Sequence, residues 1–168
     1  MAFTSNSDDG PSKNRKRHSP SEAYSKASGY CAYQERSHKE VRNKLYGYGL
    51  YQSEVEELLT QLISEGFLNE ERFAKAFAGG KFRMNKWGKN KIVHALQTHG
   101  VTPTCIQRGL REIDQSSYNQ VLRDLLEKKI SRLDEPNIYR TRQKAGQFAI
   151  GKGYEADLVW ATLKEILK

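Results

Sequence analysis

A hydrophobic pattern repeats three times along the chain around the glycines Gly49, Gly100 and Gly153. Apolar residues recur eight and four residues before each glycine, and one, six, ten and thirteen residues after it. The residues at these positions are Val41, Leu45, Leu50, Val55, Leu59 and Leu62; Ile92, Leu96, Val101, Ile106, Leu110 and Ile113; and Ala145, Ala149, Tyr154, Val159, Leu163 and Ile166. Because the glycines lie 51 and 53 residues apart, we predict a tandem repeat with a period near 50.

The spacing within each repeat predicts two helices joined at the glycine. Residues four or seven apart share one helical face, so each apolar set forms the buried stripe of a helix. The glycine suits a left-handed residue that ends the earlier helix. Polar residues that could cap the later helix follow at Ser53, at Thr102 with Pro103 behind it, and at Asp157. Ser37 and Glu40 have the spacing of a capping box for the earlier helix of the first repeat.

A third helix is predicted upstream of each pair. The segments are "LNEERFAKAFAGGKF", with Asn69 as its cap, "SYNQVLRDLLEKKISRL", and the less regular "SEAYSKASGYCAYQER". No run of alternating β-branched residues indicates a strand. We therefore predict an all-α fold, an elongated array of three tandem three-helix repeats (residues 19–66, 67–115 and 116–168). Residues 1–18 lack an apolar face and are predicted to be a disordered basic tail, whose Lys13–Arg17 run is either solvated or an arm for nucleic acid.

The composition narrows the class of partner and the compartment. The formal charge of +8 and the pI near 9.4 point to nucleic acid, an acidic protein surface or anionic lipid, although a basic excess also serves solubility. Cys31 and Cys105 stand apart, which is typical of reduced thiols. No apolar run is long enough to span a membrane or to act as a secretion signal. We expect a cytoplasmic protein without a membrane partner.

Basic residues gather ahead of the buried stripe of each middle helix. These three sets are Lys39, Arg42 and Lys44; Lys81, Arg83, Lys86, Lys89 and Lys91; and Arg140, Arg142 and Lys144. Lys89 and Arg142 both lie eleven residues before their glycine, and Lys91 and Lys144 both lie nine before. Equivalent positions of a stacked array fall along one side, so we predict a basic stripe for nucleic acid or an acidic partner. A solvated polar face is the alternative.

The segment "KFRMNKWGKNK" (residues 81–91) contains five basic residues, no acidic residue and one tryptophan. We predict that Lys81–Lys86 connects the first and middle helices of the second repeat and that Trp87 and Gly88 begin the middle helix. Trp87 either covers the core at this junction or stacks on a base of a bound nucleic acid. The uncompensated charge makes this segment the strongest candidate for contact with a polyanion.

The sequence contains no recognisable catalytic or metal site. The histidines His18, His38, His94 and His99 do not have the spacing of a metal-binding helix. Gly79 and Gly80 lack the lysine and hydroxyl residue of a phosphate-binding loop, and no serine or cysteine lies in a nucleophile motif. We predict a protein that is not an enzyme and has no catalytic residue, metal or cofactor.

Several of these motifs together resemble the RecX family of bacterial regulatory proteins. They are "RSHKEVRNKLYGYGLYQSEVEELLTQLISEGFLNEERFA", "GFLNEERFAKAF" and "WGKNKIVHALQTHGV". The resemblance covers residues 30–115 closely and residues 116–168 more loosely. It implies tandem three-helix repeats and a basic surface at the matching residues Lys39, Arg42, Lys44, Lys89 and Lys91.

The same resemblance implies a regulator that binds the RecA recombinase filament on single-stranded DNA. Family members lie in the filament groove and inhibit ATP hydrolysis, strand exchange and coprotease activity, which affects recombination, DNA repair and the SOS response. The implied partners are RecA and single-stranded DNA, with double-stranded DNA as a further candidate, and we expect a monomer. The alternatives are a general helical DNA-binding module and a helical-repeat adaptor for another acidic protein.

Overall fold

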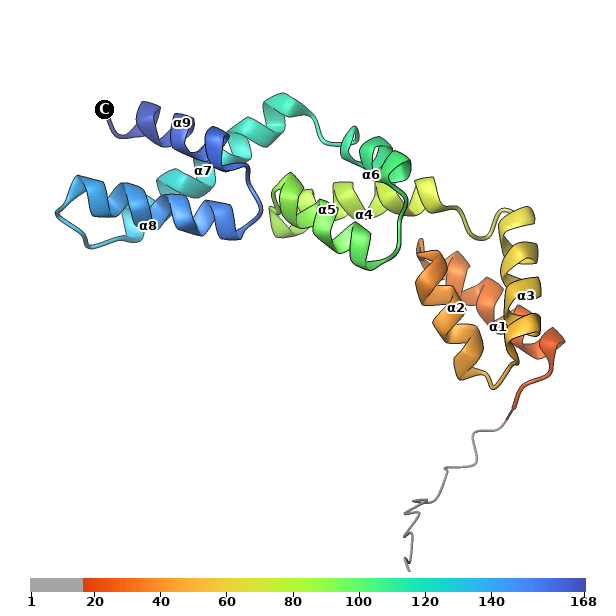
Figure 1. The fold of residues 1–168 in the computed structure, drawn as a ribbon. Helices are drawn as coiled ribbons and strands as arrows, with labels where there is room; N and C mark the ends of the chain where they lie inside the picture. The colour runs from red at the N-terminus through yellow and green to blue at the C-terminus, as the bar shows by residue number, and fades with distance from the viewer. Residues whose placement is uncertain (1–16) are drawn as a thin grey trace, which may run out of the picture.

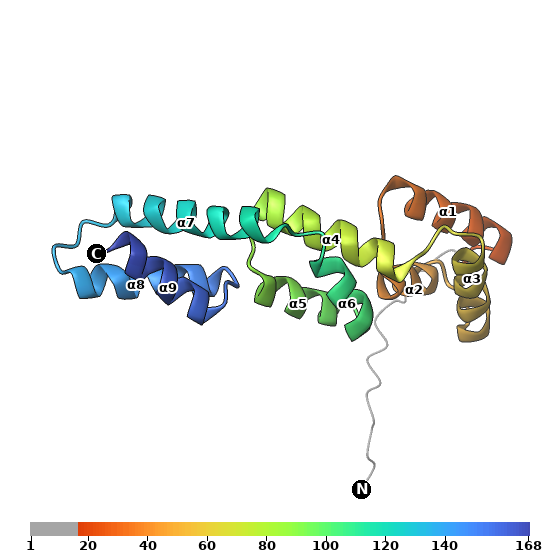
Figure 2. The ribbon, with the colours of Figure 1, turned by 90° about the horizontal axis from the view of Figure 1, so that it is seen from above.

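The computed structural model describes residues 17–168, which form nine α-helices and no strand. Of the predicted tail, only Arg17 and His18 fall within the described residues. The helices are α1 (Pro20–Tyr33), α2 (His38–Gly47), α3 (Gln52–Ser64), α4 (Glu70–Asn85), α5 (Lys89–Thr98), α6 (Pro103–Leu110), α7 (Gln115–Arg132), α8 (Ile138–Gly151) and α9 (Ala156–Ile166). They follow one another as three repeats along an elongated molecule (Figures 1 and 2). The predicted fold class is confirmed.

The glycine at the centre of each repeat ends the middle helix in a left-handed conformation. The φ angles of Gly49, Gly100 and Gly153 are +83°, +75° and +101°, values that side chains with a Cβ disfavour. In the second and third repeats the next residue closes the turn. The N–H groups of Val101 and Tyr154 donate to the carbonyls of Leu96 and Ala149 at 3.1 and 3.2 Å, the bond that closes a Schellman motif.

The repeated apolar positions form the core, but they form two cores and not three. All of them are buried except Leu110 and Ile166, which are partly buried. Apart from Leu68, which packs with the first repeat, the buried apolar residues of the second and third repeats make one continuous cluster, whereas those of the first repeat make a separate one. The first repeat also lies at an angle to the line of the other two (Figures 1 and 2).

The junction between the second and third repeats is tight and combines hydrogen bonds with a shared apolar cluster. A Cβ at Gly88 would lie 2.2 Å from the carbonyl carbon of Gly153, so the two backbones meet without an intervening side chain. The N–H of Gly88 donates to the carbonyl of Lys152 at 2.9 Å. The rings of Tyr118 and Tyr154 lie 5.0 Å apart beside this contact. Their packing joins the two repeats into one body.

The junction between the first and second repeats is mostly polar. Ser37 Oγ lies 3.2 Å from His99 Nδ1, and Lys39 Nζ donates to the carbonyl of Thr98 at 3.0 Å. Arg72 on α4 forms an ion pair with Glu35, which follows α1. These bonds orient the first repeat, but they remove little apolar surface from water.

The helix caps agree with the sequence in part. The Ser37–Glu40 capping box, the Asn69 cap and the Thr102 position are confirmed. The predictions of Ser53 and Asp157 as caps are wrong, because α3 and α9 begin after Tyr51 and Glu155. In all three repeats the N-cap residue of the last helix lies two residues after the glycine. A single residue separates the two, and its side chain packs into the core.

The first helix of the second repeat is longer than predicted. Helix α4 continues through Gly79 and Gly80 to Asn85, so Lys81–Asn85 is helical and is not a connection. The helix ends where Lys86 takes a left-handed φ of 56°. Gly79 lies under the Arg83 side chain, where a Cβ would be 2.7 Å from the guanidinium. The two glycines lower the stability of α4, but they do not end the helix, because it packs against the core.

Candidate nucleic-acid and protein interface

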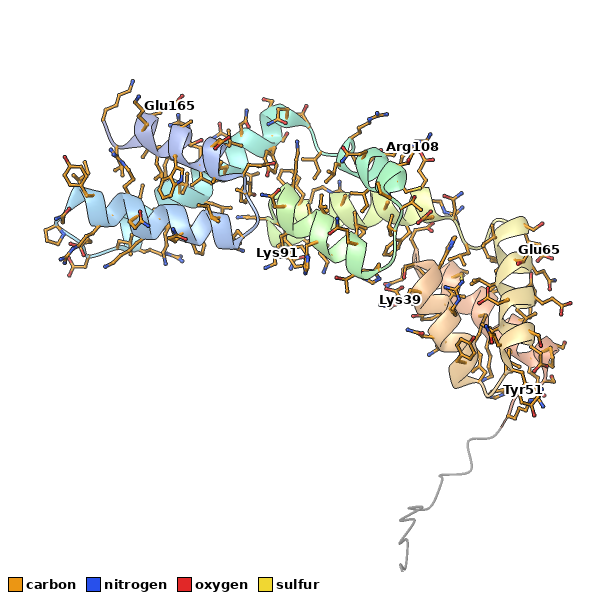
Figure 3. The ribbon with its side chains drawn as sticks, in the orientation of Figure 1. Lys39, Tyr51, Glu65, Lys91, Arg108 and Glu165 are labelled. Carbon is orange, nitrogen blue, oxygen red and sulfur yellow. The ribbon has the colours of Figure 1, made fainter. Side chains whose placement is uncertain are left out.

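The three middle helices follow one another along the molecule, each with its C-terminus near the N-terminus of the next, and α2 is inclined to α5 and α8 (Figure 1). The C-terminus of α8 meets the N-terminus of α5, where the N–H of Asn90 donates to the carbonyl of Gly153 at 2.9 Å. The C-terminus of α5 meets the N-terminus of α2 through the bond from Lys39 Nζ to Thr98. Lys39 and Lys91 therefore lie along one edge of the molecule, and Arg108 and Glu165 lie along the other (Figure 3).

The segment Lys81–Lys91 surrounds Trp87 with cations. The Nζ atoms of Lys81 and Lys91 lie 4.9 and 4.6 Å from the centre of the Trp87 ring system, within the range of a cation–π interaction. Trp87 is partly buried against the core that the second and third repeats share, and it precedes the first residue of α5 instead of beginning it. The ring thus covers the core and also holds two ammonium groups at the surface.

The remaining cations of this segment have no acidic partner among the described residues. Arg83 and Lys86 are exposed, and the carbonyl of Lys86 accepts a hydrogen bond from the Tyr154 hydroxyl at 2.9 Å. Lys89 turns toward α7, where its Nζ donates to Gln115 Oε1 at 2.9 Å. We call Trp87 and the four cations Lys81, Arg83, Lys86 and Lys91 the tryptophan patch, in which Lys81 and Lys91 lie against the ring.

Only part of the first predicted set of basic residues is free of ion pairs and so available to bind an anionic partner. Arg42 forms an ion pair with Glu56, whose carboxylate lies 2.8 Å from Arg42 Nε, and this contact lowers the pKa of Glu56. Lys44 is exposed, with its Nζ 5.1 Å from the centre of the Tyr30 ring. Lys39 is exposed at the junction with the second repeat. Two of the three cations, Lys39 and Lys44, therefore lack an acidic partner in the part of the chain that the structure describes.

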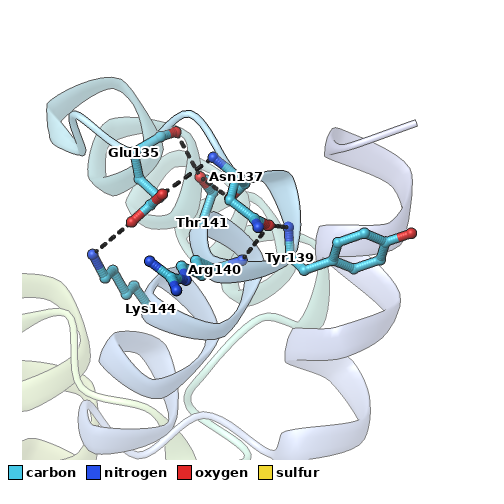
Figure 4. Close-up of polar contacts among 6 residues, drawn as sticks. All are labelled: Glu135, Asn137, Tyr139, Arg140, Thr141 and Lys144. Carbon is cyan, nitrogen blue, oxygen red and sulfur yellow. Dashed lines mark hydrogen bonds and ion pairs between the residues drawn. The ribbon is translucent and has the colours of Figure 1, made fainter.

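The third predicted set is divided among different environments, and Figure 4 shows those of Arg140 and Lys144. Lys144 pairs with Glu135 at 3.1 Å, and the Asn137 backbone N–H and the Lys144 ammonium both lower the pKa of Glu135. Arg140 is exposed. Arg142 is partly buried, its Nη2 donates to the carbonyl of Leu167 at 3.4 Å, and its Nε has no hydrogen-bond partner. The row of basic residues along the middle helices is interrupted here.

The structure adds one cation that the sequence pattern did not single out. Lys152 ends α8, and its Nζ donates to the carbonyl of Asn85 at 3.3 Å, which places it beside the tryptophan patch. Lys152 directly precedes the third glycine of the repeat, at a position occupied by Tyr48 and His99 in the other repeats. Because a contact between repeats decides its location, the register alone carried no signal for it.

Between residues 17 and 168, no group of three or more His, Cys, Asp or Glu side chains lies close enough to hold a metal ion. Burial raises the pKa of the Cys31 thiol, which opposes a role as a nucleophile. No helix in the described part of the chain is long and apolar enough to cross a membrane.

Comparisons with known proteins match all three repeats. Residues 23–62, 69–110 and 117–163 match the models of the first, second and third three-helix domains of RecX. The chain is 32% identical over 124 residues to "Regulatory protein RecX" from Clostridium perfringens (strain 13 / Type A), which covers 73% of this chain and 58% of that protein. It is 26% identical over 153 residues to the protein of the same name from Amycolatopsis mediterranei (strain U-32), covering 89% and 87%.

The fold is also similar to a solved structure. The crystal structure of RecX from Lactobacillus salivarius superposes with a TM-score of 0.80 at 22% identity, over 88% of this chain and 96% of that one. The chain spans somewhat more than half the length of several of the curated relatives that it matches. The order of the three domain matches and the shared fold agree with the resemblance seen in the motifs, and the chain belongs to the RecX family.

Proposed function

We propose that this protein regulates the RecA recombinase by lying along its filament on single-stranded DNA. It inhibits ATP hydrolysis, strand exchange and coprotease activity, and through them it affects recombination, DNA repair and the SOS response. It acts in the cytoplasm as a monomer and without catalysis. Membership of the RecX family, whose curated relatives are named regulatory proteins, supports this proposal.

The observation that carries the proposal is the tryptophan patch. Its four cations lack acidic partners among the described residues, so their field is directed at solvent and attracts a polyanion. The patch lies midway along the row of middle helices, with Lys39 beyond one end of α5 and Arg140 at the far end of α8. A long groove lined by phosphates and acidic side chains can engage several of these positions at once, and their effects multiply through effective concentration.

A general DNA-binding function makes a different use of the same patch. Phosphates attract cations whether or not a recombinase is present, and an exposed ring edge can contact a base of any single strand. The geometry favours the filament because the cations are spread along an elongated molecule and are not gathered at one groove-reading helix. Binding to bare DNA is therefore measured beside binding to the filament.

The test is a titration of the protein into RecA filaments on single-stranded DNA, with ATP hydrolysis as the readout. We expect inhibition by the wild-type protein and at least a tenfold higher inhibitory concentration for a triple charge reversal in the patch. A control triple reverses three exposed cations elsewhere that form no ion pair in the described part of the chain, so that net charge changes equally. The patch variant is Arg83→Glu, Lys86→Glu and Lys91→Glu, and the control is Lys26→Glu, Arg111→Glu and Lys164→Glu.

The outcomes separate the candidate functions. Unchanged ATP hydrolysis with a folded wild-type protein rejects the proposal. If both triple variants lose inhibition relative to the wild type by the same amount, only the net charge matters and the patch has no special role. Tight, salt-sensitive binding to bare DNA without inhibition of RecA identifies a general DNA-binding module. Absence of binding to both DNA and RecA leaves the adaptor for another acidic protein.

A further inference from the structure

A hollow of about 220 Å³ opens between α7 and α8 of the third repeat. Its apolar lining consists of Leu125 and Leu133 from α7 and its end, and Phe148 from α8, and all three side chains are partly buried. Leu133 and Phe148 lie outside the core that the second and third repeats share. Part of their apolar surface therefore faces the hollow.

The rim of the hollow is cationic. Lys128, Lys129, Arg132 and Lys152 line it, and no acidic residue does. None of the four forms an ion pair within residues 17–168, whereas neighbouring cations such as Arg123 and Lys144 do. Cations that surround apolar surface without neutralising partners favour a ligand that is both anionic and apolar.

The size of the hollow limits what can enter it. Pockets that enclose a free small-molecule ligand measure ~300–1,000 Å³, so about 220 Å³ is small for such a ligand. A water molecule takes up only ~30 Å³ in the liquid, so the hollow has room for one large apolar side chain. An anchor of this kind, seated in a pocket with a polar rim, is typical of peptide and protein recognition.

We infer that the hollow binds an acidic segment of a partner protein, which inserts one apolar side chain between Leu133 and Phe148 while its carboxylates pair with the rim. The lining argues against nucleic acid as the occupant. Lys129 Nζ lies 4.9 Å from the centre of the Phe148 ring and occupies a face on which a base would stack. The leucine side chains offer no hydrogen bond to a base edge. This site adjoins the tryptophan patch at Lys152 but contains none of the residues of that patch, and it does not depend on the function proposed for the patch.

The test uses a short fluorescein-labelled peptide in which a central Phe is flanked on both sides by Asp and Glu. A matched peptide carries Ser in place of Phe, and a labelled oligothymidylate represents nucleic acid. Fluorescence anisotropy measures the binding of each probe to the full chain. Two variants alter the rim and the lining, and a third reverses two exposed charges elsewhere. They are Lys128→Glu with Arg132→Glu, Leu133→Asn, and Lys26→Glu with Lys164→Glu.

We expect the Phe peptide to bind the wild-type chain. The rim and lining variants weaken this binding at least tenfold, equivalent to ~1.4 kcal/mol, while the distant charge reversal leaves it within twofold. Far-UV circular dichroism checks that each variant keeps its helices, and because Leu133 lies outside the core its replacement does not disturb the fold.

Three results would overturn the inference. If neither peptide binds, the hollow is not a docking site. If the Ser peptide binds as tightly as the Phe peptide and Leu133→Asn has no effect, the surface is a charged patch without an anchor pocket. If only oligothymidylate binds and the rim variant abolishes that binding, the site belongs to nucleic acid.

Discussion

Replacing Gly88 by alanine tests the close contact between the second and third repeats. The φ of Gly88 is −75°, which alanine adopts freely, so the substitution acts through space alone. The new Cβ would lie 2.2 Å from both the carbonyl carbon of Gly153 and the nitrogen of Tyr154. These are backbone atoms, so the two repeats have to separate by ~1.3 Å to restore ordinary contact distances near ~3.5 Å.

The cost follows from what that separation disrupts. Overpacking of a close contact costs ~1–3 kcal/mol. The bonds from Gly88 N–H to Lys152 and from Asn90 N–H to Gly153, both 2.9 Å, contribute ~0.5–1.5 kcal/mol each. The free energy of unfolding therefore falls by ~2–6 kcal/mol, and at ~2–4 °C per kcal/mol for a chain of this size the melting midpoint falls by ~4 °C or more.

Thermal unfolding followed by circular dichroism measures the effect, with Gly29→Ala as the control. A Cβ at Gly29 meets nothing within 4 Å, and alanine within a helix is favoured over glycine by ~0.5–1 kcal/mol. That control is expected to melt at or slightly above the wild-type temperature. A Gly88→Ala variant that melts like the wild type would refute the reasoning, because it would show that the repeats do not meet as closely as described.

Two further substitutions test the buried polar groups. Tyr118→Phe removes a hydroxyl that accepts from the Lys89 N–H at 3.0 Å and donates to Glu155 at 2.7 Å. We expect urea unfolding to show that the free energy of unfolding falls by ~1–3 kcal/mol. The control, Tyr33→Phe, alters an exposed residue and is expected to leave the stability unchanged. Burial lowers the pKa of His38. As the pH falls through ~6.5, His38 therefore becomes protonated in the unfolded chain before it does in the folded one, and the free energy of unfolding declines. We expect the melting midpoint to drop less between about pH 7.5 and 5.5 in His38→Gln than in the wild type; an equal drop would contradict this origin.

Most of the fold was predictable because the same apolar pattern occurs three times in the sequence. The glycines and the apolar positions around them recur in register, so an accident at one position does not obscure the helix that it belongs to. The predicted array of three-helix repeats is confirmed on this basis. Caps were less certain, since Ser53 and Asp157 are good capping residues that lie two positions beyond the actual N-cap residues Tyr51 and Glu155.

The location of individual cations was harder to predict, because contacts between repeats decide it. Nothing in the pattern shows that Gly88 meets Gly153, and that contact brings Lys152 beside the end of α4. Arg142 shares its register with Lys89, yet one turns toward the end of α9 and the other toward α7. Composition identified the basic segment of residues 81–91, whereas only the three-dimensional structure shows that Arg42 and Lys144 of the other two sets form ion pairs with Glu56 and Glu135.

The separation of the buried side chains into two clusters has a consequence for cooperativity. In a repeat protein, neighbours unfold together to the extent that their shared interface is strong. A shared buried cluster and backbone hydrogen bonds couple the second and third repeats, whereas the first repeat has its own separate cluster and mainly polar contacts at its junction. The molecule therefore comprises two foldons of unequal size, and the smaller can pivot or open while the larger stays intact.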